Sequence, residues 1–174
     1  MEIKKKQFPI GIQNFAELRQ GNYYYVDKTA KIIELINTSK YIFLSRPRRF
    51  GKSLTLDTIA ELFAGNKPLF TGLYAENNWD WGVKYPVIRI SFGGGASSKN
   101  NQVSDVISDT LQFLEEKWQV TNIKTTTSGR FKAIIEQCYQ STGKKVVILV
   151  DEYDKPILDN LTDPSKAIVI RNEL

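Results

Sequence analysis

The sequence predicts an α/β fold in which a mostly parallel sheet lies between two layers of helices. Three short apolar segments, at residues 41–45, 85–92 and 144–152, have the composition of strands that are buried on both faces. Between them lie segments whose apolar residues recur every three or four positions, as in amphipathic helices. This alternation of strands and helices is typical of a parallel sheet covered on both sides.

The helices follow from capping residues and apolar stripes. Ahead of the first strand, Asp27 or Thr29 can cap the N-terminus of a helix. The stripes of the four expected helices are Ile32, Ile33 and Ile36; Leu56, Ile59, Leu62 and Phe63; Val103, Val106, Ile107, Leu111, Leu114 and Trp118; and Phe131, Ile134, Ile135, Cys138 and Tyr139. Four acidic residues of the third helix lie off its stripe and are expected to face solvent: Asp105, Asp109, Glu115 and Glu116.

The last residues suggest that the fold continues beyond them. Asp163 and Pro164 have the residue types of a helix N-cap and first helical position, so the sequence ends within an expected helix. Three strands are also few for a sheet of this kind. We therefore expect one domain over residues 1–174, incomplete at its C-terminus, with a lead-in at 1–40 and a core at 41–174.

Composition limits the available chemistry. The 174 residues, 41% hydrophobic and 25% charged, are sufficient for one globular core. Cys138 is the single cysteine, which excludes an internal disulfide. The absence of histidine excludes histidine-ligated zinc, a Ser/His/Asp triad and a histidine general base. The chemistry must therefore rest on Lys, Arg, Ser and carboxylates.

Hydropathy and charge indicate the environment and the kind of partner. No apolar run approaches the roughly 18 residues that a membrane span needs, and no apolar stretch of signal-peptide length follows the basic N-terminus. We expect a cytoplasmic protein with no membrane partner. The net charge of +5 favours a polyanionic partner, and a nucleotide and a nucleic acid both qualify.

A basic loop, LSRPRRFGKSL at residues 44–54, joins the first expected strand to the next helix. It ends in GKS, as does the pattern GxxxxGK[ST], in which backbone N–H groups surround the phosphates of a nucleotide. Arg46 occupies the place of the first glycine, and Pro47 favours an extended Arg46, so we expect the strand to continue through Arg46. Alone, the short motif is equally compatible with a basic turn that opens a helix.

The residues of this loop have distinct expected roles. Gly51 allows close approach to the phosphates, Lys52 neutralises the β and γ phosphates, and the Ser53 hydroxyl binds Mg²⁺. The helix that follows directs its positive end at the same place. The residues expected to bind the nucleotide are Arg48, Arg49, Phe50, Gly51, Lys52, Ser53 and Leu54.

A second motif, VVILVDEYDKPI at residues 146–157, is an apolar strand that ends in Asp151 and Glu152. A parallel sheet binds ligands at the carboxyl ends of its strands, so both carboxylates are expected beside the loop. Asp151 would hold Mg²⁺ through its hydration shell, and Glu152 would act with Lys52 in catalysis by activating the attacking water. Adjacent residues of a strand point to opposite sides, which suits two different tasks. Alone, the two carboxylates could also merely end a strand.

Both motifs occur in the order that P-loop NTPases require, each after an apolar strand. We therefore interpret RPRRFGKS as a Walker A motif and ILVDE as a Walker B motif. One further strand lies between them in the sequence, as in the P-loop branch that keeps a catalytic glutamate. The predicted fold is accordingly the three-layer αβα sandwich of the P-loop NTPases.

Several segments resemble the bacterial AAA-ATPase-like family. They are FPIGIQNFAELR, YYYVDKT, FLSRPRRFGKSL, ELFAGNKPLFTGLY and LVDEYDKPI, and together they span most of the chain. The resemblance implies that Arg46 is the expected residue of its position and that the nucleotide is ATP, bound with Mg²⁺. It assigns the nucleotide roles to Lys52, Ser53, Asp151 and Glu152. It also implies a C-terminal partner domain that resembles the PD-(D/E)xK nucleases, through which nucleic acid could be bound.

Three functions are weighed on these observations. The first is Mg²⁺-dependent ATP binding and hydrolysis that regulates the attached nuclease-like domain, with the present chain binding ATP better than it hydrolyses it. The second is a nucleotide-gated switch with little turnover. The third is a basic nucleic-acid-binding domain that uses no nucleotide. A homo-oligomer is left open.

The remaining polar candidates receive weaker assignments. Of Arg46, Arg48 and Arg49, we expect one to lie near the nucleotide and the others to pair with protein carboxylates. Asp154 could cap a helix that begins at Pro156, so it is left out of the catalytic set.

Two aromatic segments have two interpretations each. The tyrosines of YYYVDKT could cover the nucleotide base or pack at the edge of the sheet. Trp79, Trp81 and Tyr85 could stack on single-stranded bases or form a peripheral aromatic cluster. In both cases packing is the expected role.

Overall fold

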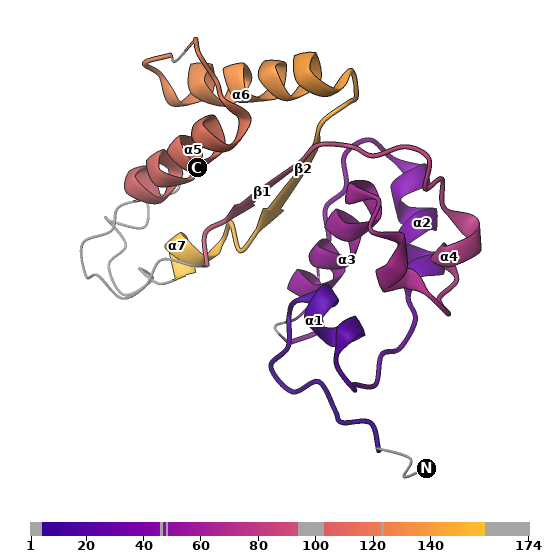
Figure 1. Cartoon of the computed structure of the whole chain (residues 1–174). Helices are drawn as coiled ribbons and strands as arrows, with labels where there is room; N and C mark the ends of the chain where they lie inside the picture. The colour runs from indigo at the N-terminus through magenta and orange to yellow at the C-terminus, as the bar shows by residue number, and fades with distance from the viewer. Residues whose placement is uncertain (1–4, 46, 48, 94–102, 123, 159–174) are drawn as a thin grey trace. The chain divides into compact units, whose positions relative to one another are not determined.

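The computed structural model describes residues 5–45, 47, 49–93, 103–122 and 124–158. The chain forms two compact units (Figure 1), an N-terminal unit, Met1–Tyr85, and a C-terminal unit, Pro86–Leu174. No helix among the described residues is long and apolar enough to cross a membrane.

The N-terminal unit is built from short helices around an aromatic core. Its elements are α1 (Phe15–Gln20), α2 (Thr29–Thr38), α3 (Lys52–Ala64), the 3₁₀ helix η1 (Lys67–Phe70) and α4 (Ala75–Asn78). The side chains of Phe15, Leu62 and Phe70 are completely buried, and the Phe15 and Phe70 rings lie 4.9 Å apart. Burying a side chain of this size contributes about 2 kcal/mol, so this core fixes α3 firmly.

Two expected helices of this unit are confirmed. α2 buries Ile32 and Ile33 of its predicted stripe, and α3 buries Ile59 and Leu62. At the start of α2, the Asp27 carboxylate accepts hydrogen bonds from the backbone N–H and the hydroxyl of Thr29, at 2.8 and 2.7 Å. The N-cap residue is Lys28, so the prediction that Asp27 or Thr29 is the cap is wrong, although Asp27 binds the first helical residue from the position before the cap.

The predicted strand at residues 41–45 is wrong. These residues belong to no strand, and the side chains of Tyr41 and Phe43 are 80% and 72% exposed. A strand needs a neighbour that pairs with its backbone N–H and C=O groups. Among the described residues, neither the two-stranded sheet nor the isolated bridge includes this segment, although its composition favours a strand.

The C-terminal unit contains a parallel pair of strands with helices packed against it. Its elements are β1 (Val87–Ser91), α5 (Val103–Trp118), α6 (Thr127–Thr142), β2 (Val147–Asp151) and α7 (Lys155–Leu158). The strands at 85–92 and 144–152 are therefore confirmed. The register runs from Val87 opposite Val147 to Ser91 opposite Asp151. Because the strands are parallel, their carboxyl ends lie together.

α5 and α6 pack on this sheet through their predicted stripes. The core is formed by Ile88, Leu111, Leu114, Ile134 and Cys138. Tyr139 is an exception, because 56% of its surface is exposed. The expectation that every strand is buried on both faces is also wrong for β2, where Ile148 and Val150 are 41% and 42% exposed. A sheet of two described strands leaves each strand with an uncovered edge.

The architecture agrees with the α/β class at a coarse level, since it combines helices with a small parallel sheet. The three-layer P-loop sandwich and the single domain over residues 1–174 stay predictions. The helix expected after Asp163 lies outside the described residues.

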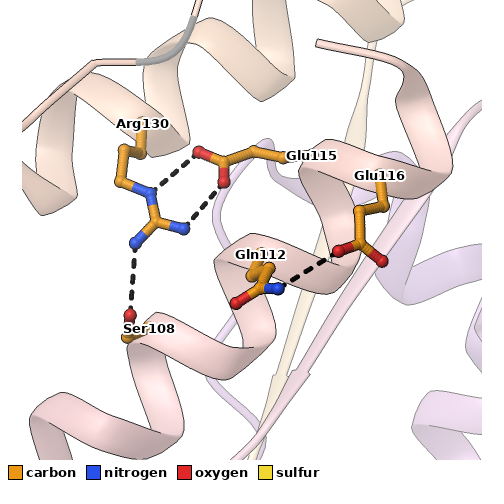
Figure 2. Close-up of polar contacts among 5 residues, drawn as sticks. All are labelled: Ser108, Gln112, Glu115, Glu116 and Arg130. Carbon is orange, nitrogen blue, oxygen red and sulfur yellow. Dashed lines mark hydrogen bonds and ion pairs between the residues drawn. The ribbon is translucent and has the colours of Figure 1, made fainter.

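An ion pair links α5 to α6 (Figure 2). Arg130 of α6 donates to both carboxylate oxygens of Glu115, at 2.8 and 2.7 Å, and also to the Ser108 hydroxyl at 3.3 Å. The side chain of Glu115 is only 8% exposed, so the expectation that it faces solvent is wrong. The bidentate hydrogen bonds to a fixed guanidinium offset the cost of burying this carboxylate.

We predict that Glu115→Gln lowers the free energy of unfolding by about 2 kcal/mol at pH 7, because it leaves the half-buried Arg130, whose side chain is 18% exposed, without its counter-charge. The hydrogen bonds from Arg130 lower the pKa of the Glu115 carboxyl from 4.5, although burial opposes this shift. The contribution of the pair is therefore complete above pH 4.5 and is lost as the pH falls through the lowered pKa. Urea unfolding at a series of pH values should show the difference between wild type and variant narrowing in acid.

The matched control is Lys132→Ala, which removes an exposed α6 ion pair whose nitrogen and oxygen lie 3.8 Å apart. It should change stability by less than about 0.5 kcal/mol. Equal effects of the two substitutions, or a Glu115→Gln effect independent of pH, would contradict the assigned role of the buried pair.

Candidate functional site

The GKS segment lies at the start of α3. Gly51 is the N-cap residue and has left-handed backbone angles, φ 72° and ψ 31°, while Lys52 and Ser53 are the first two helical residues. The Gly51 carbonyl accepts hydrogen bonds from the Thr55 backbone N–H at 3.0 Å and from the Thr55 hydroxyl at 2.8 Å. Two bonds from the first turn of the helix therefore hold the loop at Gly51.

The N-terminus of α3 has the properties of an anion site. Within the described residues no side chain caps it by a hydrogen bond, and its first turn contains no acidic residue. The free N–H groups and the positive end of the helix dipole are therefore not neutralised by a protein carboxylate within this turn. Lys52 adds a full positive charge to the same end, which suits a phosphate ligand.

The loop ahead of Gly51 is strained. Arg49 has a φ of 66°, so two left-handed residues lie within three positions. A non-glycine residue in this region costs about 1 kcal/mol, and such strain concentrates at functional sites. Phe50 lies between them with 63% of its surface exposed. The sequence predicts that Arg46 and Arg48 contact a nucleotide or protein carboxylates. Both arginines lie outside the described residues.

The expected contact residues near the helix start differ in exposure. Gly51 is exposed, whereas Lys52, Ser53 and Leu54 are each half-buried. A Cβ placed on Gly51 would meet no protein atom within 4 Å. The glycine is therefore required by its backbone angles and not by packing against the described residues.

Asp57 anchors α3, and the sequence analysis missed it. This α3 residue is 2% exposed, and its carboxylate accepts a hydrogen bond from the backbone N–H of Phe15, the first residue of α1. The charge stabilises the N-terminus of α1 and fixes α3 against it. The one available signal was an acidic residue between the apolar Leu56 and Ile59 of a predicted stripe.

The carboxyl end of β2 carries the second motif. Asp151 is the last strand residue and lies level with Ser91 of β1. Its Oδ1 accepts a hydrogen bond from the Glu152 backbone N–H at 3.0 Å. Glu152 has a φ of 53° and lies outside the strand, so the two carboxylates are not consecutive residues of an extended segment as predicted. The two side chains are therefore set apart by a sharp backbone turn at Glu152, and not by the alternation of side chains along a strand.

The residues after Glu152 begin α7. The Glu152 carbonyl accepts a hydrogen bond from the Lys155 N–H at 3.0 Å, and the Asp154 carbonyl accepts one from the Leu158 N–H at 3.0 Å. α7 begins at Lys155, one residue earlier than the predicted start at Pro156. Asp154 immediately precedes this first helical residue. This position agrees with a role in starting the helix.

Glu152 lies against Gly93, which follows β1. A Cβ built on Gly93 would overlap Oε2 of Glu152 and crowd its carboxyl carbon. The sequence analysis missed this contact because Gly93 and Glu152 are far apart in the sequence. Only the pairing of β1 with β2 brings the two residues together.

The aromatic and cysteine candidates have structural roles. The Trp79 and Trp81 indole N–H groups donate to the carbonyls of Leu62 and Glu76, at 3.1 and 2.9 Å. These bonds agree with the expected aromatic cluster. Cys138 is completely buried, and this burial raises the pKa of its thiol to about 11, which makes it unreactive.

The four residues that are predicted to bind Mg²⁺ or to act in catalysis thus fall into two groups. Lys52 and Ser53 lie in the N-terminal unit, and Asp151 and Glu152 lie in the C-terminal unit. The structure confirms that Lys52 and Ser53 begin a helix and that Asp151 ends a strand. The assembly of all four residues into one site stays a prediction. Within the described ranges no cluster of three or more His, Cys, Asp or Glu residues could hold a metal ion.

Comparison with known proteins identifies the family. A family model described as "Predicted AAA-ATPase" matches residues 9–174. The chain belongs to the AAA-ATPase-like family. It is also 50% identical over 173 residues to an "Uncharacterized protein in vnfD 5'region" of Azotobacter chroococcum mcd 1. The match covers 99% of this chain but 34% of that relative, so the chain spans about a third of its length. No solved structure matches the chain.

Membership of the AAA-ATPase-like family agrees with the resemblance found in the sequence and connects the protein to ATP. The relative's description assigns no activity, and the match does not extend to a nuclease-like domain. The roles of individual residues must therefore be argued from their geometry.

We predict that Gly51→Ala lowers the free energy of unfolding by about 1 kcal/mol, because alanine must adopt the left-handed angles of the α3 N-cap. Gly143 is the matched control, since it has a φ of 64° and a Cβ there would also meet no atom within 4 Å. Gly143→Ala should cost a similar amount. Urea unfolding measures both values, and an unchanged stability of Gly51→Ala would contradict the left-handed cap.

Proposed function

We propose that this member of the AAA-ATPase-like family binds ATP with Mg²⁺ and that the full-length protein hydrolyses it. The observation that carries the proposal is the start of α3, where a left-handed glycine precedes Lys52 and Ser53 and no side chain caps the helix. An uncapped helix N-terminus with an adjacent lysine can accept a polyphosphate. ATP is chosen over other nucleotides because the family is described as an ATPase.

In this proposal the N-terminal unit binds the phosphates. Backbone N–H groups from Arg48 to Leu54 would surround them, and Lys52 would neutralise the charge that develops on the β and γ phosphates. RPRRFGKS would thus act as a Walker A motif although it lacks the first glycine. The left-handed Arg49 and Gly51 support this role, because they turn the backbone sharply just before the helix.

The C-terminal unit would supply the carboxylates. Ser53 and Asp151 would hold Mg²⁺, and the ion would supply charge neutralisation and orientation of the phosphates. This donor set fits Mg²⁺, which prefers few protein ligands and retains phosphate oxygens and water. ILVDE would then be the Walker B motif, with Asp151 at the end of β2.

Glu152 would act as the general base. A water would form the new P–O bond while the bond from the γ phosphorus to the β–γ bridging oxygen breaks, and Glu152 would take the proton that the water loses. The geometry supports a separate task for Glu152, because it leaves the strand at a left-handed turn while its N–H is bonded to Asp151.

Regulation of an attached nuclease-like domain is part of the proposal. It is supported by the resemblance described above, which implies a C-terminal nuclease-like domain. A Glu152→Gln variant that holds ATP without cleaving it should fix the attached domain in its ATP-bound state. DNA cleavage that is equal with and without ATP in that variant would refute regulation.

We predict that Lys52→Ala abolishes ATP binding measured by calorimetry, with affinity falling at least ~100-fold because a charge on the phosphates is lost. Lys67→Ala is the matched control, since Lys67 is an exposed lysine of η1 in the same unit. It should leave affinity unchanged. Retained affinity in Lys52→Ala would contradict the assignment, and DNA binding that survives this substitution with steep salt dependence would favour a nucleic-acid-binding domain.

We predict that Glu152→Gln in the full-length protein retains ATP affinity within about twofold while phosphate release falls at least ~100-fold, because glutamine preserves the shape but cannot accept the proton. Steady-state phosphate release and calorimetry measure the two quantities. Unchanged turnover would remove Glu152 from this role. Equal, very slow turnover in wild type and variant would favour the nucleotide-gated switch.

A further inference from the structure

The Glu152 carboxylate occupies the space that a side chain at Gly93 would fill. A Cβ there would overlap Oε2 of Glu152 and lie 2.5 Å from its carboxyl carbon. Gly93 does not have the left-handed angles that favour glycine at Gly51. The need for glycine at position 93 is therefore steric and comes from one neighbouring side chain.

Hydrogen bonds fix the backbone on the Gly93 side of this contact. Beyond the last paired residues, the Phe92 N–H donates to the Asp151 carbonyl at 3.2 Å, which extends the pairing of β1 with β2. The next N–H, that of Gly93, donates to the Ser91 hydroxyl at 3.3 Å. Gly93 is thus held at the carboxyl end of the sheet by its own strand and by β2.

The Glu152 side is fixed as well. Its N–H donates to Oδ1 of Asp151, its carbonyl accepts from Lys155, and its φ of 53° turns the side chain out of the strand direction. With both backbones held, rotation of the flexible Glu152 side chain is what remains to relieve the overlap with a new Cβ. The smallest possible substitution at position 93 would therefore displace it.

We infer that Gly93 is a positioning residue for Glu152, because its missing side chain leaves the space at the end of β1 in which the catalytic carboxylate lies. This inference rests on the proposed role of Glu152 as general base. A general base must be within hydrogen-bond reach of its water, and a displacement of about 1 Å can reduce the rate by ~100-fold. Nucleotide binding depends on the other motif and is unaffected.

The experiment is Gly93→Ala in the full-length protein, with kcat and ATP affinity measured separately. Turnover should fall ~10- to 100-fold while affinity stays within about twofold of wild type. The matched control is Gly82→Ala, since Gly82 is also outside the left-handed region and a Cβ there approaches only the Asp80 carboxylate, at 3.2 Å. The control should retain full turnover, and unchanged turnover in Gly93→Ala would overturn the inference.

A cycle of variants tests the contact independently of catalysis. Gly93→Ala should lower the melting temperature in the wild-type background, and Glu152→Ala should restore it, because the double variant no longer contains the colliding carboxylate. Failure of Glu152→Ala to rescue the melting temperature would overturn the inference even if Gly93→Ala alone were too unstable to assay. If Glu152→Gln keeps full turnover, the proposed function of Glu152 fails instead, and the melting cycle still decides whether Gly93 positions its carboxylate.

Discussion

The parallel register of β1 and β2 is the constraint on which the C-terminal unit depends. Because Ser91 lies opposite Asp151, the last residues of both strands reach the same level, and the following residues, Gly93 and Glu152, meet beyond it. A shift of one residue would exchange the faces on which all these side chains lie. Ile88 would then leave the core that it forms with α5 and α6. The hydrophobic core and the position of the two carboxylates are thus set by the same register.

In the N-terminal unit the corresponding role belongs to the anchoring of α3. Among the described residues no side chain caps the start of this helix, while its next turns are held against α1 through Asp57 and bury Leu62 completely. An open helix start is less stable than a capped one by about 1 kcal/mol. The packing of the later turns compensates for this cost. A helix start without a cap can therefore be retained on a stable helix.

Much of the fold could be predicted from local patterns. The four apolar stripes and two of the three strands were predicted because residue periodicity reports which face of an element is buried. The segment 41–45 was mispredicted because a strand also requires a partner, which its composition cannot reveal. The residues of the candidate site also differ in whether a local sequence pattern predicts them. Glycine, lysine and carboxylate motifs identified Gly51, Lys52 and Asp151, whereas Asp57 and Gly93 act through residues distant in the sequence.

The buried, protonated thiol of Cys138 has a practical consequence for spectroscopy. It is the single cysteine of the sequence, it is completely inaccessible, and its pKa of about 11 keeps the thiolate scarce at neutral pH. Maleimide reagents should therefore leave the folded wild-type protein unlabelled. A cysteine added at an exposed position of each unit could carry a fluorophore without first removing the native one. Energy transfer between two such dyes would report directly on the separation of the two units in solution.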